Sequence, residues 1–314
     1  MWYNSRMKFN WRYPIRFEPQ VKHAIWGQET WLVSGHPSCP SVVANGIYAG
    51  RTLPELVDEF GAGMLGSAAD GVRFPLLVKV IEARDRLSLQ VHPSEASSKV
   101  CGGDPKTEVW YMLGADDGAE IFAGLREGTD RDALAASLHD GSAERFVARF
   151  RVKRGDVMFI PGGLVHSIGG GCRIFELQQT SDTTWRLHDW NRIDANTGLP
   201  RELNEREGLD SIDWTLPTPE LVHDGTRGLG VPSPEDLVRS DCFRLSALDL
   251  ATPVRMPGRP ESFRILYVDD GACTVEVDGA EAVPANAGDS VLVPASTDFT
   301  LSPGPHAHLL LSEM

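Results

Sequence analysis

The sequence predicts a mainly β fold built from two related β domains with a few helical insertions. Short segments rich in Val, Ile, Leu and Phe alternate with turn-forming Gly and Pro along the whole chain, and one strand-and-turn pattern occurs twice. The chain has 314 residues. At about 150 residues per domain, this length allows two domains.

The predicted strands are apolar segments bounded by turn residues. In chain order they include FPLLVKVIEA, TEVWYML, GDVMFIP, CRIFELQQ, FRLSALDL, FRILYV, CTVEVDG and DSVLVP. The seventh segment ends in Asp278-Gly279, and this dipeptide predicts a tight hairpin turn.

Helix signals are fewer. Thr52, Thr129 and Ser233 each stand where an N-cap residue would, with acidic residues soon after, and Pro follows Ser233 at the first helical position. Besides a helix starting at Ser233, helical insertions are expected near residues 52–60, 129–150 and 202–222.

The repeated pattern divides the chain. Residues 155–163 read GDVMFIPGG and residues 288–296 read GDSVLVPAS, so each copy has Gly-Asp, an apolar strand, Pro and a small residue. Two copies of one β unit predict an N-terminal domain at 1–200 and a C-terminal domain at 241–314, joined by a connecting segment at 201–240.

The first copy extends to G-D-x4-P-x-G-x2-H-x3-G, from Gly155 to Gly170. This spacing resembles the second signature motif of cupins, which are jelly-roll β-barrels. The resemblance implies two cupin-type jelly-roll domains, a bicupin, with His166 as a metal ligand in the first. In the second copy Ser296 and Phe299 replace the motif's Gly and His. Because Phe offers no ligand atom, the C-terminal domain is expected to lack the metal site.

Further candidate ligands lie upstream. In the segment LSLQVHPSE, strand alternation places Gln90 and His92 on one face, although a surface strand would show the same pattern. Glu108 shares a strand face with a tryptophan and a methionine, and a carboxylate buried there needs a partner, most simply a metal. Together with His166, these residues form a nitrogen and oxygen donor set that suits one Zn²⁺, with Fe²⁺, Mn²⁺ and Co²⁺ as alternatives.

The composition excludes several function classes. The 30 basic and 44 acidic residues give a net charge of −14, which disfavours nucleic acid and anionic membranes as partners. No apolar run approaches the roughly 18 residues of a membrane helix, and the N-terminal segment lacks the apolar region of a signal peptide. The five cysteines are scattered without a CxxC pair, as in a reduced cytoplasmic protein. An anionic substrate would need a locally cationic pocket.

Several motifs, in order, resemble the short bacterial form of the type I mannose-6-phosphate isomerase family. They are ETWLVSGHPSCPSVVANG, FPLLVKVIEARDRLSLQVHPS, PKTEVWYML, GDVMFIPGGLVHSIG and LQQTSDTTWRLHDWNR. The resemblance implies a cytoplasmic, zinc-dependent aldose–ketose isomerase that interconverts mannose 6-phosphate and fructose 6-phosphate through a cis-enediol(ate), with the sugar phosphate as its partner.

The resemblance also implies residue roles. Arg186, in the family's SD-x3-R motif, is expected to be catalytic and to bind substrate, although a salt bridge would also explain it. Lys106 is expected to bind phosphate or assist proton transfer, and Asp182 to bind substrate or position Arg186. Glu176 and Gln178 alternate inward on one strand and could support the ligands.

Two other functions stay open at the sequence level. The first is a non-catalytic sugar-binding or sugar-phosphate-binding cupin homologue, which retention of the ligands, Lys106 and Arg186 disfavours. The second is a metal-dependent oxygenase, because cupins host many chemistries. Gln90 in place of a histidine weakens the oxygenase interpretation.

Overall fold

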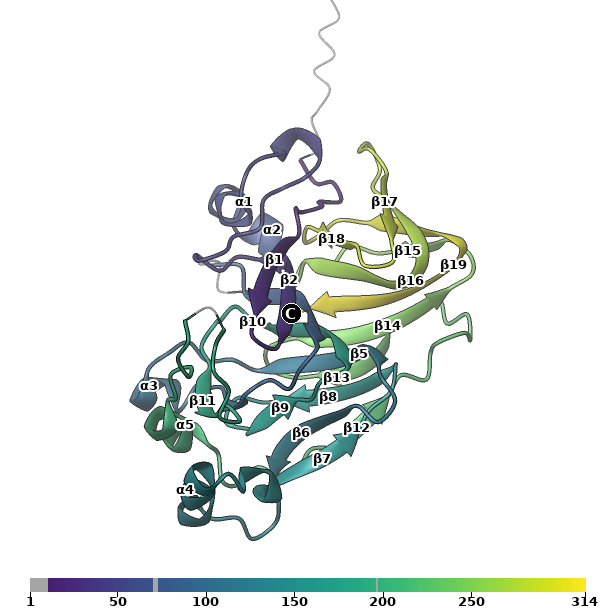
Figure 1. Cartoon of the computed structure of the whole chain (residues 1–314). Coiled ribbons are helices and arrows are strands. Elements are labelled where there is room, and N and C mark those ends of the chain that lie inside the picture. Colours follow the sequence, from purple (N-terminus) through teal and green to yellow (C-terminus); the bar gives the residue numbers. More distant parts are fainter. Residues whose placement is uncertain (1–10, 70–72, 196) are drawn as a thin grey trace, which may run out of the picture.

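The computed structural model describes residues 11–69, 73–195 and 197–314, so most of the N-terminal basic and aromatic segment lies outside the described residues. The expectation of a mainly β protein is confirmed: three sheets fill most of the molecule (Figure 1). Every strand pair is antiparallel, which suits consecutive short strands joined by turns.

The first sheet is the central layer of the molecule. Its strand order is β1 (Gln20–Ala24), β2 (Gly27–Ser34), β3 (Leu76–Ala83), β10 (Cys172–Gln179), β5 (Glu108–Ala115), β8 (Asp156–Ile160) and β12 (Leu221–His223).

The second sheet faces one side of the first. Its strand order is β11 (Trp185–His188), β4 (Leu89–Val91), β9 (His166–Ile168), β6 (Glu120–Leu125) and β7 (Val147–Arg151). Apolar side chains from both sheets form one core cluster, which includes Ile81, Met112, Ile121 and Ile168.

The third sheet belongs to the C-terminal part of the chain and is drawn green to yellow in Figure 1. Its strands are β13 (Glu235–Arg239), β14 (Arg244–Leu250), β19 (Phe299–Glu313), β16 (Arg264–Glu276) and β17 (Val283–Asn286), with β15 (Val254–Met256) paired to β19 and β18 (Ser290–Val293) paired to β16. The predicted turn at Asp278-Gly279 lies between β16 and β17, where the amide of Ala280 donates to the carbonyl of Val277 at 3.0 Å.

Strand alternation gives the first sheet two different faces. Val78, Tyr111 and Phe175 point to one side and pack with Leu245 and Tyr267 of the third sheet. Their sequence neighbours point to the other side, toward the second sheet. The central sheet is therefore apolar where it meets the C-terminal part and carries the polar residues of the candidate site on its opposite face.

Helices occupy the connections. They are α1 (Leu53–Phe60), α2 (Ala62–Leu65), α3 (Ser98–Cys101), α4 (Arg131–Asp140) and α5 (Glu205–Ser211), with 3₁₀ turns η1 (Gly46–Tyr48) and η2 (Ala143–Phe146). Thr52 caps α1 as predicted, in a complete capping box with Glu55. The N-cap of α4 is Asp130, one residue after the expected Thr129.

The helix expected from Ser233 is wrong. Residues 235–239 form strand β13, which pairs with β14 from Glu235 opposite Ala247 to Arg239 opposite Arg244. Pairing with an available sheet edge overrides the local Ser-Pro-acid signal, because tertiary context outweighs a weak propensity. The insertion expected near 202–222 is helical only over α5 and ends in strand β12.

Two further expectations are the absence of a metal site in the C-terminal half and the closure of the sheets into barrels. Phe299, at the position of the motif histidine, is 2% exposed and packs in the apolar core of the third sheet. The pairing between described strands gives open sheets, so barrel closure of the jelly-roll type stays a prediction. No helix in the described ranges is long and apolar enough to cross a bilayer.

Candidate metal centre and active site

The candidate site lies on the face of the first sheet that points toward the second sheet. Alternation places Glu108 of β5 and Glu176 of β10 on this face, whereas Val109 and Leu177 join the core on the opposite side. In the strand register, Glu176 lies directly opposite Lys79 of β3. Three charged side chains therefore meet in the interior between the two sheets.

The second sheet adds the remaining predicted ligands. Gln90 of β4 pairs with His166 of β9 in register, and His92 follows β4 directly. His92, Glu108 and His166 are all buried, and their candidate ligand atoms lie within 4.8 Å of one another. Gln90 Nε2 lies 3.1 Å from His166 Nε2. The structure thus brings together all four residues that the sequence predicted as ligands.

Both histidines are oriented for coordination. His92 Nδ1 lies 2.8 Å from the carbonyl of Thr183, and His166 Nδ1 lies 2.9 Å from the carbonyl of Leu164. An Nδ1–H donated to each carbonyl makes Nε2 the ring nitrogen that carries the lone pair and can accept a metal. Burial lowers the pKa of His92 to about 4, assisted by the charge of Lys106, and burial also lowers the pKa of His166. Both imidazoles are therefore neutral at pH 7, as metal ligands must be.

Lys106 lies within the ligand group. Its Nζ is 2.6 Å from Glu108 Oε2, 3.0 Å from His92 Nε2 and 3.6 Å from Glu176 Oε1. Burial alone would raise the pKa of Glu108, but the charge of the adjacent Lys106 ammonium is the chief influence that outweighs burial and holds that pKa well below its usual range. Glu108 is consequently an ionised carboxylate in the interior.

A second buried cation was not predicted. Lys79 Nζ lies 3.0 Å from Glu176 Oε1 and 3.4 Å from Glu29 Oε2, and Glu29 also accepts from Trp31 Nε1 at 2.8 Å. Burial would lower the pKa of Lys79, but Glu176, Glu29 and Glu108 raise it above its ordinary value. The available signal was a single lysine inside the apolar strand FPLLVKVIEA, where a charge requires partners.

The two expected supporting residues have different surroundings. Glu176 joins the site, because Trp110 Nε1 donates to its Oε2 at 3.0 Å and to Glu108 Oε1 at 2.9 Å. Gln178 instead holds the turn after β10, since its Nε2 donates to the carbonyls of Gln179 and Ser181 at 2.8 and 2.7 Å.

Arg186 reaches the site from β11, where it pairs in register with Gln90. Its Nη1 donates to the carbonyl of Glu202 at 2.7 Å, and its buried Nε has no hydrogen-bond partner among the described residues. The alternative, a surface salt bridge to Asp182 or Asp189, is not found among the described residues, and Asp189 pairs instead with Arg192 and Arg201. Burial and the charge of Arg201 lower the pKa of Arg186.

A cavity of about 370 Å³ opens from this group of residues. Its lining contains more cations than anions. The cations are Lys22, Lys79, Lys106, Arg186 and Arg201, and the anions are Glu29, Asp182 and Glu176. A protein with a net charge of −14 therefore carries a locally cationic cavity, as an anionic small molecule requires.

Comparisons with known proteins identify the family. A family model described as phosphomannose isomerase type I, catalytic domain, matches residues 13–114. The mannose-6-phosphate isomerase of Streptococcus mutans is 32% identical over 299 residues, covering 90% of this chain and 92% of that protein. The mannose-6-phosphate isomerase ManA of Bacillus subtilis is 36% identical over 229 residues, covering 67% and 71%.

A solved structure supports the same family. The crystal structure of a mannose 6-phosphate isomerase from Bacillus subtilis matches with a TM-score of 0.81 and 29% identity, over 96% of this chain and 99% of that chain. The fold and the site define an enzyme of the aldose–ketose isomerase class. The chain belongs to the type I phosphomannose isomerase family.

Proposed function

We propose that this protein interconverts mannose 6-phosphate and fructose 6-phosphate with one Zn²⁺ per chain. The observation that supports this function best is the convergence of two neutral imidazoles, one ionised carboxylate and one amide in the interior, beside a cationic cavity that Gln90 and Lys106 line. Membership in the family makes the sugar phosphate the first substrate to test.

The residues fit a zinc ion. Gln90, His92, Glu108 and His166 would hold it, since nitrogen and carboxylate donors in this number suit Zn²⁺ with a position left open. Glu108 Oε2 is buried and is ion-paired with Lys106 Nζ at 2.6 Å, and because a carboxylate oxygen has two lone pairs, one remains for a metal. When bound, the metal would supply Lewis-acid stabilisation of negative charge on the sugar oxygens.

The reaction moves one proton between two carbons. Removal of the proton at C2 of the aldose forms the C1–C2 double bond and moves the carbonyl electron pair to O1. Return of a proton to C1, together with transfer of the O2 proton to O1, then gives the ketose. The charge that develops on oxygen requires donors fixed in advance.

Chain residues supply such donors. Arg186 lines the cavity with an unused Nε–H, and we assign it to stabilisation of the cis-enediolate and to substrate binding. Lys106, in the interior of the same cavity, is assigned to proton transfer at the substrate oxygens and to substrate binding. Asp182, on the cavity wall, is assigned to binding sugar hydroxyls.

The remaining expectations complete the proposal. Each half of the chain is a cupin-type jelly-roll domain, at 1–200 and 241–314, supported by the repeated motif and by separate sheets in the two halves. The protein works in the cytoplasm, which the five free thiols support.

The test is an assay of mannose 6-phosphate conversion by the purified protein, as prepared, after chelation and after zinc is added back. We expect activity to disappear on chelation and to return with zinc. Absence of activity in every metal condition, from a folded sample that binds the sugar phosphate, would overturn the proposal in favour of a non-catalytic binding protein.

A further inference from the structure

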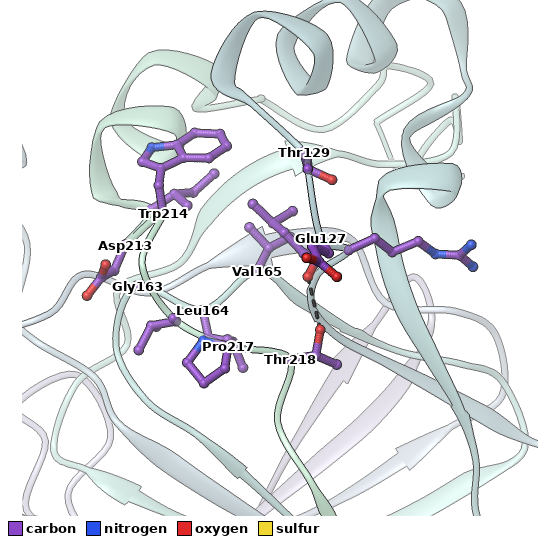
Figure 2. A pocket seen from close by; sticks show the side chains of 14 residues that line it. Glu127, Thr129, Gly163, Leu164, Val165, Asp213, Trp214, Pro217 and Thr218 are labelled. Atoms are coloured by element: carbon purple, nitrogen blue, oxygen red, sulfur yellow. Dashed lines mark hydrogen bonds between the residues drawn. The ribbon is translucent and has the colours of Figure 1, made fainter.

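A second cavity, of about 410 Å³, lies apart from the proposed active site. Figure 2 shows its lining, which comes from residues 125–129 after β6, residues 163–165 before β9 and residues 212–218 after α5. The volume falls within the range of about 300 to 1,000 Å³ that small-molecule sites occupy. No residue assigned above to metal or sugar phosphate lines it.

The walls of this cavity depend on two close backbone approaches. A Cβ at Gly124, which has φ +78°, would lie 2.7 Å from Pro219 Cδ. A Cβ at Gly163, which has φ +93°, would lie 3.0 Å from Asp213 Cβ. Because any larger residue would push the 212–219 segment outward, these glycines allow that segment to close one side of the cavity. The amide of Asp213 also donates to the carbonyl of Gly163 at 3.0 Å.

The base of the cavity is apolar, and its wall includes an indole. Leu164, Val165 and Ile212 are buried at the base. The side chain of Trp214 stands at the wall and remains 36% exposed, although a large aromatic ring usually packs away from water. Figure 2 shows Trp214 and Thr129 on either side of Val165. A ligand ring with C–H groups on one face could pack that face against the indole ring of Trp214.

The rim is polar and slightly acidic. The lining carries one cation, Arg126, and two carboxylates, those of Glu127 and Asp213. The Arg126 Nε–H already donates to the carbonyl of Val147 at 3.1 Å, and Asp213 Oδ1 accepts from the amide and hydroxyl of Thr215 at 2.9 and 2.6 Å, which leaves Asp213 Oδ2 for a ligand. This charge balance is opposite to that of the cationic cavity. Carboxylates accept hydrogen bonds from hydroxyl groups and repel phosphate.

We propose that this cavity binds a neutral monosaccharide, whose ring stacks on Trp214 while its hydroxyls donate to Asp213 and Glu127. A pyranose combines an apolar face with a hydroxyl-bearing edge, and the cavity combines an apolar base and indole with an acidic rim. The inference goes beyond the proposed isomerase function and does not depend on it. Unphosphorylated sugar would bind here, and sugar phosphate would be excluded.

The test uses D-mannose as the probe, with saturation-transfer NMR and calorimetric titration of the full chain. The measurements are made with and without excess mannose 6-phosphate, which the proposed function assigns to the other cavity. We expect saturable mannose binding that the sugar phosphate does not displace. The W214A variant should weaken mannose binding about threefold to tenfold, the range that an aromatic stacking contact contributes.

Matched variants separate stacking from folding. W214F retains a ring and should recover most of the binding, and D213N should weaken it without loss of the fold. L229A, which shortens a side chain that is 70% exposed elsewhere, should bind mannose as the wild type does. The proposal is overturned if the wild type shows no saturable binding, or if mannose 6-phosphate displaces mannose and W214A binds it unchanged.

Discussion

Lys79 allows the contribution of one buried charge to the free energy of unfolding to be tested. Replacing it with Met would leave Glu29 without its cation and leave Glu176 with only Lys106, 3.6 Å away. We expect K79M to lose about 3 to 5 kcal/mol of unfolding free energy, the cost of removing one partner of a buried ion pair. Urea denaturation in the presence of chelator measures the change. K99A, at an exposed position, serves as the control, and equal stability of K79M and wild type would contradict the prediction.

Arg186 tests the catalytic assignment separately from metal binding. If its guanidinium stabilises the enediolate, R186A should lower kcat about 10²-fold to 10³-fold, as loss of a preorganised donor does. Zinc content per chain should not change, because the four proposed ligands are intact. R173A removes an exposed arginine that lies 3.5 Å from Glu82 and is the matched control. A fully active R186A variant, or one that loses its zinc, would refute the role.

The sequence predicted which candidate ligands come together better than it predicted the residues around them. His166 and Glu108 could be found because fixed spacing and strand alternation are local properties of a chain. Lys79 could not be assigned a role from its own segment, because its partners Glu29 and Glu176 come from β2 and β10. Ion pairs between distant strands depend on sheet order, which one sequence does not specify.

At the scale of elements, the start of α4 gives a discriminating test. The sequence favoured Thr129 as N-cap, whereas in the structure Asp130 Oδ1 accepts from the amide of Ala133 at 2.8 Å. D130A should therefore lower the unfolding free energy by about 1 kcal/mol, the usual effect of losing an N-cap. T129A should change it by less than about 0.5 kcal/mol. Thermal and urea unfolding of both variants measure the difference, and the reverse order would place the cap at Thr129.

The same element shows where local prediction succeeds. Capping residues identify the neighbourhood of a helix start, as at Thr52, but they do not decide between adjacent candidates. Ser233 shows the stronger limitation: its segment carries a helix signal, yet residues 235–239 become an edge strand because β14 offers hydrogen-bonding groups beside them. Pairing with strand β14, which comes later in the chain, outweighs the short local helix signal at Ser233.

At the scale of the whole molecule, the expected connecting segment joins both halves. Its strand β12 extends the first sheet, and its strand β13 extends the third. Between them, Asp224 accepts from Tyr111 of the first sheet at 2.8 Å and lies 2.9 Å from His308 of the third. His308 Nδ1 lies 3.0 Å from Asp269, which also pairs with Arg227. The two halves are therefore linked through a buried ionic network.

This network predicts a pH dependence of stability. Burial would lower the pKa of His308, but its hydrogen bonds to Asp224 and Asp269 outweigh burial and raise that pKa. A raised folded-state pKa contributes stability that is complete below the unfolded value of 6.5 and is lost as the pH rises through the folded value. Within that window the wild type should lose up to about 1.4 kcal/mol per pH unit.

The measurement is urea unfolding from pH 6 to pH 9, with chelator present so that zinc affinity does not contribute. H308Q should be less stable than wild type at pH 6 and should lack the decline above pH 6.5, because glutamine does not titrate. H139Q changes a histidine whose side chain is 70% exposed, and it should retain the wild-type profile. If H308Q kept the wild-type slope, the proton would be bound elsewhere, and the buried network would not be the pH-sensitive link between the halves.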